Sequence, residues 1–164
     1  MKKIYLIKTI LAAIIILTIS CKKTENPPLA EPEVPFDLVV AKTQIETAGE
    51  AYVIALNKGD SIGLANCYTS DAKFMQPNAK TVEGRANIQK LFSQWMKGGM
   101  PKFSMKTVGI WGNQENMFAE EEWTFSDKNG KILDSGKALE IFKMEDGKWK
   151  LYRDCYNSDM PCPK

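Results

Sequence analysis

The second half of the chain constrains the fold most, because it is a run of strand-like segments joined by turn signals. Three connecting stretches, GNQEN, SDKNGK and EDGK, are rich in turn-forming residues. Around them, β-branched and aromatic residues are concentrated in KFSMKTVGIW, NMFAEEEWTF, ILDSGKALEIFKM and KWKLYRDCY. From residue 102 onward the sequence therefore predicts antiparallel strands.

Hydrophobic periodicity predicts three helices before these strands. The first covers residues 38–58, with Ile45 and Tyr52 on its apolar stripe, and ends at a Gly-Asp pair. A second, short helix reaches about residue 68, the third covers residues 85–97, and the short strand DAKFMQP lies between them. Helices followed by antiparallel strands predict an α+β fold, with the helices on one face of a curved sheet.

The first 20 residues are typical of an export signal. Lysines precede an apolar run over residues 10–19, which is too short for a stable membrane span. Because Ser20 and Cys21 end that run, the segment resembles a bacterial lipoprotein signal, in which Cys21 is lipidated and becomes the new N-terminus. An uncleaved anchor and a soluble secreted protein are the alternatives.

Residues 21–36 are predicted to be the lipidated cysteine and a proline-rich, extended tether, because this composition cannot bury a core. A single domain is then expected over residues 37–164. Lys22, rather than aspartate, follows the lipidated cysteine, which favours delivery to the outer membrane of a Gram-negative host. We therefore expect a lipid-anchored protein of the bacterial cell envelope, held on the membrane by its acyl chains.

Charge and composition exclude several functions. Residues 1–20 carry three of the 22 basic residues and none of the 20 acidic ones, so the remaining chain has a net charge of about −1. No basic stripe with interleaved aromatic residues is visible, so we expect no nucleic-acid partner. The chain has no histidine, which removes the usual zinc sites, the nucleophile systems that depend on histidine, and histidine acid–base chemistry.

The cysteines agree with export. Cys155 and Cys162 flank the turn-rich hexapeptide YNSDMP, so a disulfide between them would close a small loop in an oxidising compartment. Cys67 lies in a helical run and is expected to be a buried thiol.

Glu140 is the most unusual candidate for a functional residue. It lies in ALEIF, where strand alternation places Ala138, Glu140 and Phe142 on one face and Leu139 and Ile141 on the other. Neither face is otherwise polar, yet an unpaired carboxylate in an apolar interior costs several kcal/mol or takes up a proton. Glu140 therefore needs a polar cavity or a partner.

Two stretches resemble the nuclear-transport-factor-2-like superfamily, close to its SnoaL-like branch and to its lipoprotein members of the domain-of-unknown-function type. The first is AYVIALNKGDSIGLANCYTSDAKFMQPNAKTVEGRANIQKLF, and the second is DGKWKLYRDCYNSD. Together they cover roughly residues 45–158 and are specific for fold. The resemblance implies a cystatin-like cone, in which three helices and a strongly curved, mainly antiparallel sheet enclose a pocket. It says little about activity, because this fold hosts enzymes, binding modules and assembly domains.

The resemblance extends to the ketosteroid isomerases of the same superfamily, which hold an oxyanion with a tyrosine and an acid and move a proton with an aspartate. By position, Tyr52 matches the tyrosine and Glu140 the oxyanion acid, but the base position falls on Gln76. Glutamine cannot abstract a proton near neutral pH. This departure argues against isomerase chemistry of that kind.

The pocket register of the superfamily assigns inward residues on each strand. On the last predicted strand, KWKLYRDCY and the residues after it, this register points Tyr152, Asp154 and Tyr156 into the pocket. It points Trp149, Leu151 and Arg153 away from the pocket. The resulting candidate ligand-binding residues are Tyr52, Phe74, Gln76, Trp95, Glu121, Trp123, Glu140, Phe142, Asp154 and Tyr156.

Two functional hypotheses follow from these residues. One is an envelope-tethered domain that binds a small, partly hydrophobic or amphiphilic molecule without turnover and without a cofactor. The other is a cofactor-independent lyase, isomerase or hydrolase that uses Asp154 or Glu121 as base, with Glu140 and Tyr52 as further catalytic candidates. A calcium or magnesium site built from carboxylates is a third alternative, but no metal site is predicted.

The outer sheet face commonly pairs two subunits in this superfamily, which implies a homodimer. The register places Val108, Ile110, Leu139, Ile141, Trp149 and Leu151 on that face. An apolar patch of this size is unusual on a small monomer.

Overall fold

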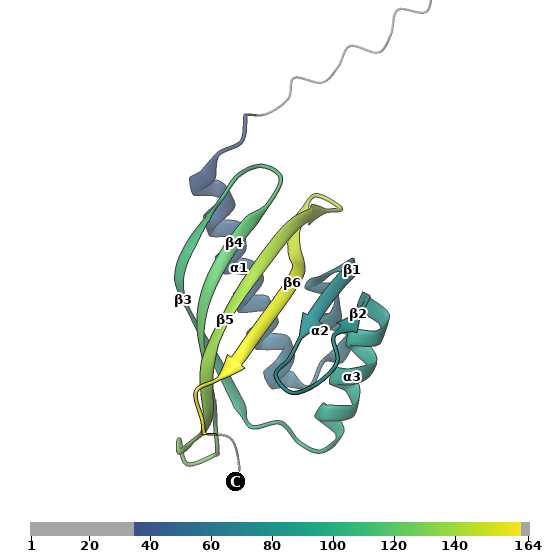
Figure 1. The fold of residues 1–164 in the computed structure, drawn as a ribbon, viewed down its shortest axis with the longest axis vertical. Coiled ribbons are helices and arrows are strands. Elements are labelled where there is room, and N and C mark those ends of the chain that lie inside the picture. Colours follow the sequence, from purple (N-terminus) through teal and green to yellow (C-terminus); the bar gives the residue numbers. More distant parts are fainter. Residues whose placement is uncertain (1–34, 162–164) are drawn as a thin grey trace, which may run out of the picture. The chain divides into compact units, whose positions relative to one another are not determined.

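The computed structural model describes residues 35–161, so the predicted signal segment, Cys21, most of the tether and Cys162 lie outside the described residues. Figure 1 shows the order of the elements along the chain. They are α1 (Leu38–Lys58), α2 (Ser61–Asn66), β1 (Tyr68–Met75), β2 (Val82–Glu83), α3 (Arg85–Lys97), β3 (Lys102–Gly112), β4 (Met117–Ser126), β5 (Ile132–Glu145) and β6 (Lys148–Ser158). Within residues 35–161, no helix is both long and apolar enough to cross a membrane.

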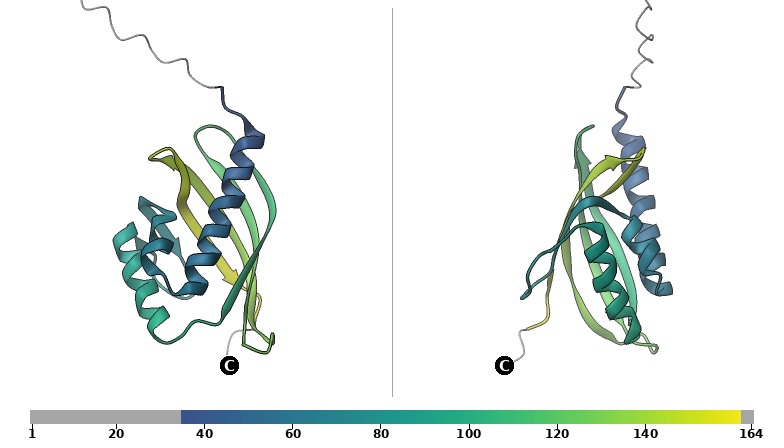
Figure 2. Two further views of the ribbon diagram at one scale, coloured as in Figure 1. Left: turned by 180° about the vertical axis from the view of Figure 1, so that it is seen from behind. Right: turned by 90° about the vertical axis from the view of Figure 1, so that its right-hand side faces the viewer.

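The six strands form one sheet in the order β2-β1-β6-β5-β4-β3. All neighbouring pairs are antiparallel except β1 and β6, which run parallel. Figures 1 and 2 show the helices against one face of the curved sheet, which we call the inner face. The opposite, outer face of β3–β6 is left uncovered. The predicted α+β, cystatin-like architecture is confirmed.

Helix α1 begins and ends where the sequence predicts. The Asp37 carboxylate accepts hydrogen bonds from the amides of Val39 and Val40, which satisfies two free N–H groups of the first turn. Gly59 ends the helix with φ 68°, a left-handed conformation that glycine adopts without strain. Asn57, two residues earlier, exchanges two 2.8 Å hydrogen bonds with the backbone of Phe103 and so fixes α1 to the start of β3.

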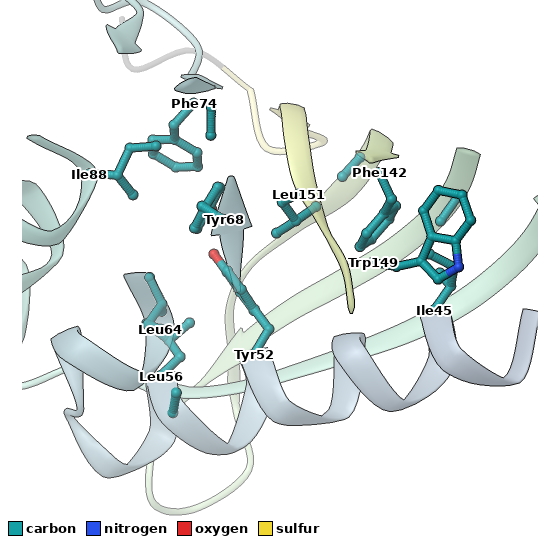
Figure 3. Packing of buried hydrophobic residues seen from close by; sticks show 14 of the residues in the cluster. Ile45, Tyr52, Leu56, Leu64, Tyr68, Phe74, Ile88, Phe142, Trp149 and Leu151 are labelled. Atoms are coloured by element: carbon teal, nitrogen blue, oxygen red, sulfur yellow. The ribbon is translucent and has the colours of Figure 1, made fainter. Parts of the chain in front are cut away.

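The hydrophobic core lies between the helices and the inner face. Figure 3 shows Tyr52 rising from α1 with its hydroxyl toward Tyr68 of β1. Farther along α1, Ile45 packs near Phe142 and Trp149 of the sheet. The largest fully buried side chains include Tyr68, Phe92, Phe142, Ile45, Leu56, Leu64, Ile88 and Met117.

The second helix is shorter than predicted. It ends at Asn66, and Cys67 is its partly buried C-terminal cap. Tyr68, predicted at the end of that helix, is instead the first residue of β1, where Arg85 at the start of α3 donates a 2.8 Å hydrogen bond to its carbonyl oxygen. The Arg85 guanidinium also pairs with Glu145 of β5. The prediction of a loop after β1 missed the two-residue strand β2.

A β-bulge in β6 changes the predicted register of that strand. Ile141 pairs with Arg153, whereas the next residue, Phe142, pairs with Leu151, so Tyr152 is the extra residue. Trp149 and Leu151 therefore face the core and are buried, contrary to the prediction. Tyr152 was wrongly placed inside: its ring lies under the cationic groups of Lys143 and Arg153.

A second bulge, in β3, has a similar effect. Thr107 pairs with Glu121, and Gly109 pairs with Glu120, so Val108 is the extra residue. Ile110 consequently pairs with Ala119 and packs against the core, not on the outer face as predicted.

Candidate functional site

A cavity lies between α1, α3 and the inner face of the sheet. Its volume is about 60 Å³, and it opens to solvent at one end. It is smaller than most small-molecule pockets, so a ligand that binds here must extend through the mouth. Its lining residues are Tyr52, Leu56, Phe74, Phe92, Trp95, Met100, Phe103, Met105, Trp123, Phe125, Ala138, Glu140, Asp154 and Tyr156.

Aromatic rings make most of the wall and support one another. Trp123 meets Tyr156 edge-on with ring centroids 5.6 Å apart, and Phe74 stacks on Tyr156 at 5.5 Å. The indole ring of Trp123 packs against β5 at Gly136, its neighbour across the strand pair. A Cβ atom at Gly136 would lie 2.6 Å from the indole ring and 1.9 Å from the carbonyl oxygen of Asn157. The wall therefore depends on this one glycine.

Two carboxyl groups are the acidic part of the lining. Glu140 of β5 and Asp154 of β6 are direct cross-strand partners, and their side chains are only 4% and 3% exposed. Opposed residues of an antiparallel pair have Cβ atoms about 4.5–5.5 Å apart. Glu121 of β4, diagonal to Glu140 and 2% exposed, completes a group of three buried acids on adjacent strands, although it does not line the cavity.

Two tyrosines that contact each other lie next to Asp154, and one of them is hydrogen-bonded to it. The Tyr68 hydroxyl donates a hydrogen bond of 2.5 Å to Asp154 Oδ2. The rings of Tyr52 and Tyr68 meet edge-on, with centroids 6.1 Å apart. Burial and the Asp154 charge raise the pKa values of both tyrosines well above 10, so both hydroxyls keep their protons at neutral pH. The tyrosines therefore serve as neutral hydrogen-bonding groups, not as bases.

The acids titrate at unusual pH values because water is excluded from them. Burial raises the pKa of Asp154 to about 6, and the hydrogen bond from Tyr68 acts in the opposite direction. Burial, followed by the charges of Asp154 and Glu121, raises the pKa of Glu140 well above its usual 4.5. Since two adjacent carboxylates cannot both ionise cheaply in an apolar site, the pair shares one proton, and the hydrogen bond from Tyr68 favours the negative charge on Asp154 and the proton on Glu140.

Glu121 has its own partner. Thr107 Oγ1 donates a 3.0 Å hydrogen bond to Glu121 Oε1. Burial raises the pKa of Glu121 to about 7, and the Thr107 hydrogen bond lowers it. The other carboxyl oxygen, Oε2, and the indole nitrogen of Trp123 are buried without a hydrogen-bond partner among the described residues. Such groups are rare in folded proteins.

The nearby basic residues face away from the acids. Arg153, next to Asp154 in sequence, donates hydrogen bonds to the carbonyl oxygens of Asp71 and Tyr152. Lys150 pairs with Glu145 and Asp146 at the other end of β6. Within residues 35–161, no lysine or arginine lines the cavity.

The structure places seven of the ten predicted ligand-binding residues on the cavity wall: Tyr52, Phe74, Trp95, Trp123, Glu140, Asp154 and Tyr156. Three others do not line it. Gln76 follows the end of β1 and is half-buried, and Glu121 is covered by its neighbours. Phe142, two residues after Glu140 on β5, lines a separate void of about 10 Å³, roughly the space of one water molecule.

Sequence reasoning missed several wall residues and one supporting residue. Among them, Leu56 lies one helical turn from Tyr52, and Phe125 alternates with Trp123, so both could have been found from periodicity. Tyr68 could not, because its segment was predicted to be helical. Cys155 is exposed on β6; since Cys162 is not described, their disulfide stays a prediction.

This arrangement can hold a small molecule by its polar end. The aromatic wall offers apolar contact, the protonated Glu140 can donate a hydrogen bond, and Asp154 can accept one. In the described part of the chain, no three acidic or cysteine side chains are grouped as metal ligands would be.

Comparison with known proteins identifies the family. The sequence model of the SnoaL-like domain matches residues 50–152, more than half of the chain, so the protein belongs to the SnoaL-like domain family. The expected membership of the nuclear-transport-factor-2-like superfamily is thereby confirmed. A search of curated proteins found no match.

Solved structures share the fold. A cystatin-like domain of unknown function from Nostoc punctiforme has a TM-score of 0.69 at 12% identity, over 77% of this chain and 82% of that one. A ketosteroid isomerase-like protein from Erwinia carotovora has a TM-score of 0.62 at 19% identity, over 73% of this chain and 96% of that one. A protein of unknown function from Mycobacterium tuberculosis has a TM-score of 0.64 at 19% identity, over 76% of this chain and 75% of that one. At these identities the similarity concerns the fold alone.

Proposed function

We propose that this protein is an envelope-tethered domain that binds a small, partly hydrophobic molecule in the cavity, without catalytic turnover. The observation that carries the proposal is the juxtaposition of an aromatic wall with the buried pair Glu140 and Asp154. Apolar walls with a few convergent polar groups are the usual composition of small-molecule sites. The apolar body of the ligand lies along the rings, and its polar end meets the carboxyl pair.

The absence of turnover rests on the groups at the cavity. The base position of the ketosteroid isomerases is occupied by Gln76, whose amide cannot take up a proton and whose side chain is not part of the wall. The tyrosine hydroxyls are held neutral, and Glu140 is protonated. These groups bind and orient a ligand better than they move its protons.

One observation favours enzymatic activity as a second candidate. The pKa of Asp154 is raised to about 6, close to the value that suits a general base at neutral pH, and Asp154 faces the cavity beside a protonated Glu140. A lyase, isomerase or hydrolase that needs no cofactor would use Asp154 as base and Glu140 as acid.

Tethering to the envelope completes the proposal. The lipoprotein-like signal and Cys21 supply a lipid anchor, the tether reaches to residue 36, and the domain begins at α1. The pocket is then held near the membrane surface, where amphiphilic molecules are concentrated, and the outer sheet face pairs two copies of the domain.

Binding is tested by filling the cavity. Ala138 lines the cavity, whereas Leu139, its neighbour on β5, is 52% exposed on the outer face. We expect the unlipidated Cys21→Ser protein to bind the neutral dye Nile red at one saturable site per chain. Ala138→Phe should weaken this binding at least about tenfold by filling the cavity, and Leu139→Phe should not. Equal binding by both variants would refute the cavity as the binding site.

A further inference from the structure

We propose that the ligand of this cavity is an organic amine, whose ammonium group lies between Glu140 and Asp154 and whose apolar body lies against the aromatic wall. This inference rests on the proposed function and names the chemical class of the ligand.

The acids lack a counter-ion. Glu121, Glu140 and Asp154 are all at most 4% exposed, and they lie on the inner face of three adjacent strands. Within the described residues, no lysine or arginine lines the cavity, and the nearest one in sequence, Arg153, faces the other side of the sheet. Buried acids without a cation are rare, because desolvating a charge is costly. A cationic ligand removes this imbalance.

Unused acceptors face the cavity. Asp154 Oδ2 accepts from Tyr68, but Oδ1 accepts no hydrogen bond from a described residue, and neither oxygen of Glu140 does. An ammonium group has three N–H donors on one atom, which matches acceptors converging from two neighbouring strands. A hydroxyl group has one donor and leaves most of them unpaired.

The rings beside the acids also suit a cation. Phe74, the partner of Asp154 on β1, and Tyr156, two residues from Asp154 on β6, line the cavity next to the carboxyl pair, and their rings stack with centroids 5.5 Å apart. Aromatic faces attract ammonium groups, and the attraction is largest where water is excluded.

A second, independent observation points to a bound molecule. Glu140 is only 4% exposed and lines the cavity, and its carboxyl group makes no hydrogen bond to a residue among 35–161. A buried polar group without a partner costs about 1–3 kcal/mol. The ammonium group of the ligand supplies that partner.

The test compares three probes with one aromatic body: phenethylamine, phenethyl alcohol and phenylacetate. The full-length protein is placed in phosphatidylcholine nanodiscs, and empty nanodiscs serve as the blank in titration calorimetry. Near pH 7 we expect phenethylamine to bind about ten- to a hundredfold more tightly than phenethyl alcohol, because hydrogen bonds between charged groups are the stronger ones. Phenylacetate should bind most weakly.

Proton release is a second readout. The ammonium charge should ionise Glu140, so phenethylamine binding should release protons, as measured in buffers of different ionisation enthalpy, whereas phenethyl alcohol should release none. Affinity for the amine should rise with pH while Asp154 ionises. The titratable side chains that face this pair are Tyr52, Cys67, Tyr68, Glu121 and Tyr156.

Matched variants separate the outcomes. Asp154→Asn and Glu140→Gln keep the shape of the site and should each abolish the preference for the amine. Glu120→Gln, on the outward-facing side of β4, should leave it unchanged. If the alcohol binds as tightly as the amine, the amine inference is wrong while the proposed function stands. If none of the probes binds above the blank, both are contradicted.

Discussion

Tyr68 at the start of β1 donates a 2.5 Å hydrogen bond to Asp154 on β6, across 86 positions of sequence. The contact joins the α2–β1 junction to the acid at the cavity, so the protonation of Asp154 depends on a residue that does not itself line the cavity.

Replacing Tyr68 with phenylalanine should raise the pKa of Asp154 above its value of about 6, because the ionised carboxylate loses its donor. Above that pH the variant should lose about 1–3 kcal/mol of unfolding free energy. Carboxyl-carbon NMR titration and denaturant unfolding measure the two effects. Tyr152→Phe, on the other side of β6, is the matched control. An Asp154 that titrates identically in wild type and Tyr68→Phe would show that the hydrogen bond is unimportant.

The buried acids should make the protein less stable as the pH rises. The folded-state pKa of Glu121 is raised to about 7, so its contribution to stability is fully present below the unfolded value of 4.5 and is lost between pH 4.5 and about 7. A shift of this size corresponds to a loss on the order of 3 kcal/mol. Glu140 and Asp154 act in the same direction.

Glu121→Gln should therefore flatten this decline, as measured by denaturant unfolding at a series of pH values. Glu122→Gln is a suitable control, because Glu122 is the exposed neighbour on β4. If the two variants have the same pH dependence of unfolding free energy as wild type, Glu121 is not desolvated in solution.

Much of the fold could be predicted from sequence because local signals coincide with it. The bounds 38–58 and 85–97 were predicted correctly, since Gly59 ends the first helix and Gly84 precedes the third. On β4, strict alternation put Glu121 and Trp123 on one face, and the family resemblance selected that face as the inner one, where both are buried.

The remaining features depend on tertiary structure. The bulges at Val108 and Tyr152 leave no mark in the hydrophobic pattern, so strict alternation failed beyond each of them. Tyr68 was missed because SIGLANCY has helical periodicity, whereas parallel pairing with β6 makes its last residue the start of β1. The inward position of Glu140 came from the family resemblance, and the structure gives it Asp154 as neighbour.

The anchor is tested at Cys21. If Cys21 is acylated, the protein should partition into the detergent phase, and Cys21→Ser should be released from the membrane or remain unprocessed. Phase separation in a cloud-point detergent followed by intact-mass measurement detects both results. A Cys21→Ser protein with the wild-type membrane distribution would exclude lipid anchoring.

The outer sheet face should pair two copies of the domain. Its apolar patch consists of the exposed Val108, Trp111 and Leu139 and the half-buried Phe118 and Ile141, and the Trp111 and Phe118 rings stack 6.0 Å apart. Two copies can bury this patch against each other around a two-fold axis. Light scattering of the Cys21→Ser protein at tens of micromolar should give a dimer mass, and Leu139→Arg should give a monomer mass. A wild-type monomer under these conditions would contradict the assignment.

The central claim is that the cavity holds a small molecule, and the most direct measurement is native mass spectrometry of the protein purified from its own envelope. We predict one small molecule per chain in the wild-type protein, released on denaturation and absent from Ala138→Phe, whose added ring occupies the cavity. Leu139→Phe, altered on the outer face, should retain the molecule. A wild-type protein whose native and denatured masses are equal, or an Ala138→Phe protein that carries the same molecule, would contradict the account.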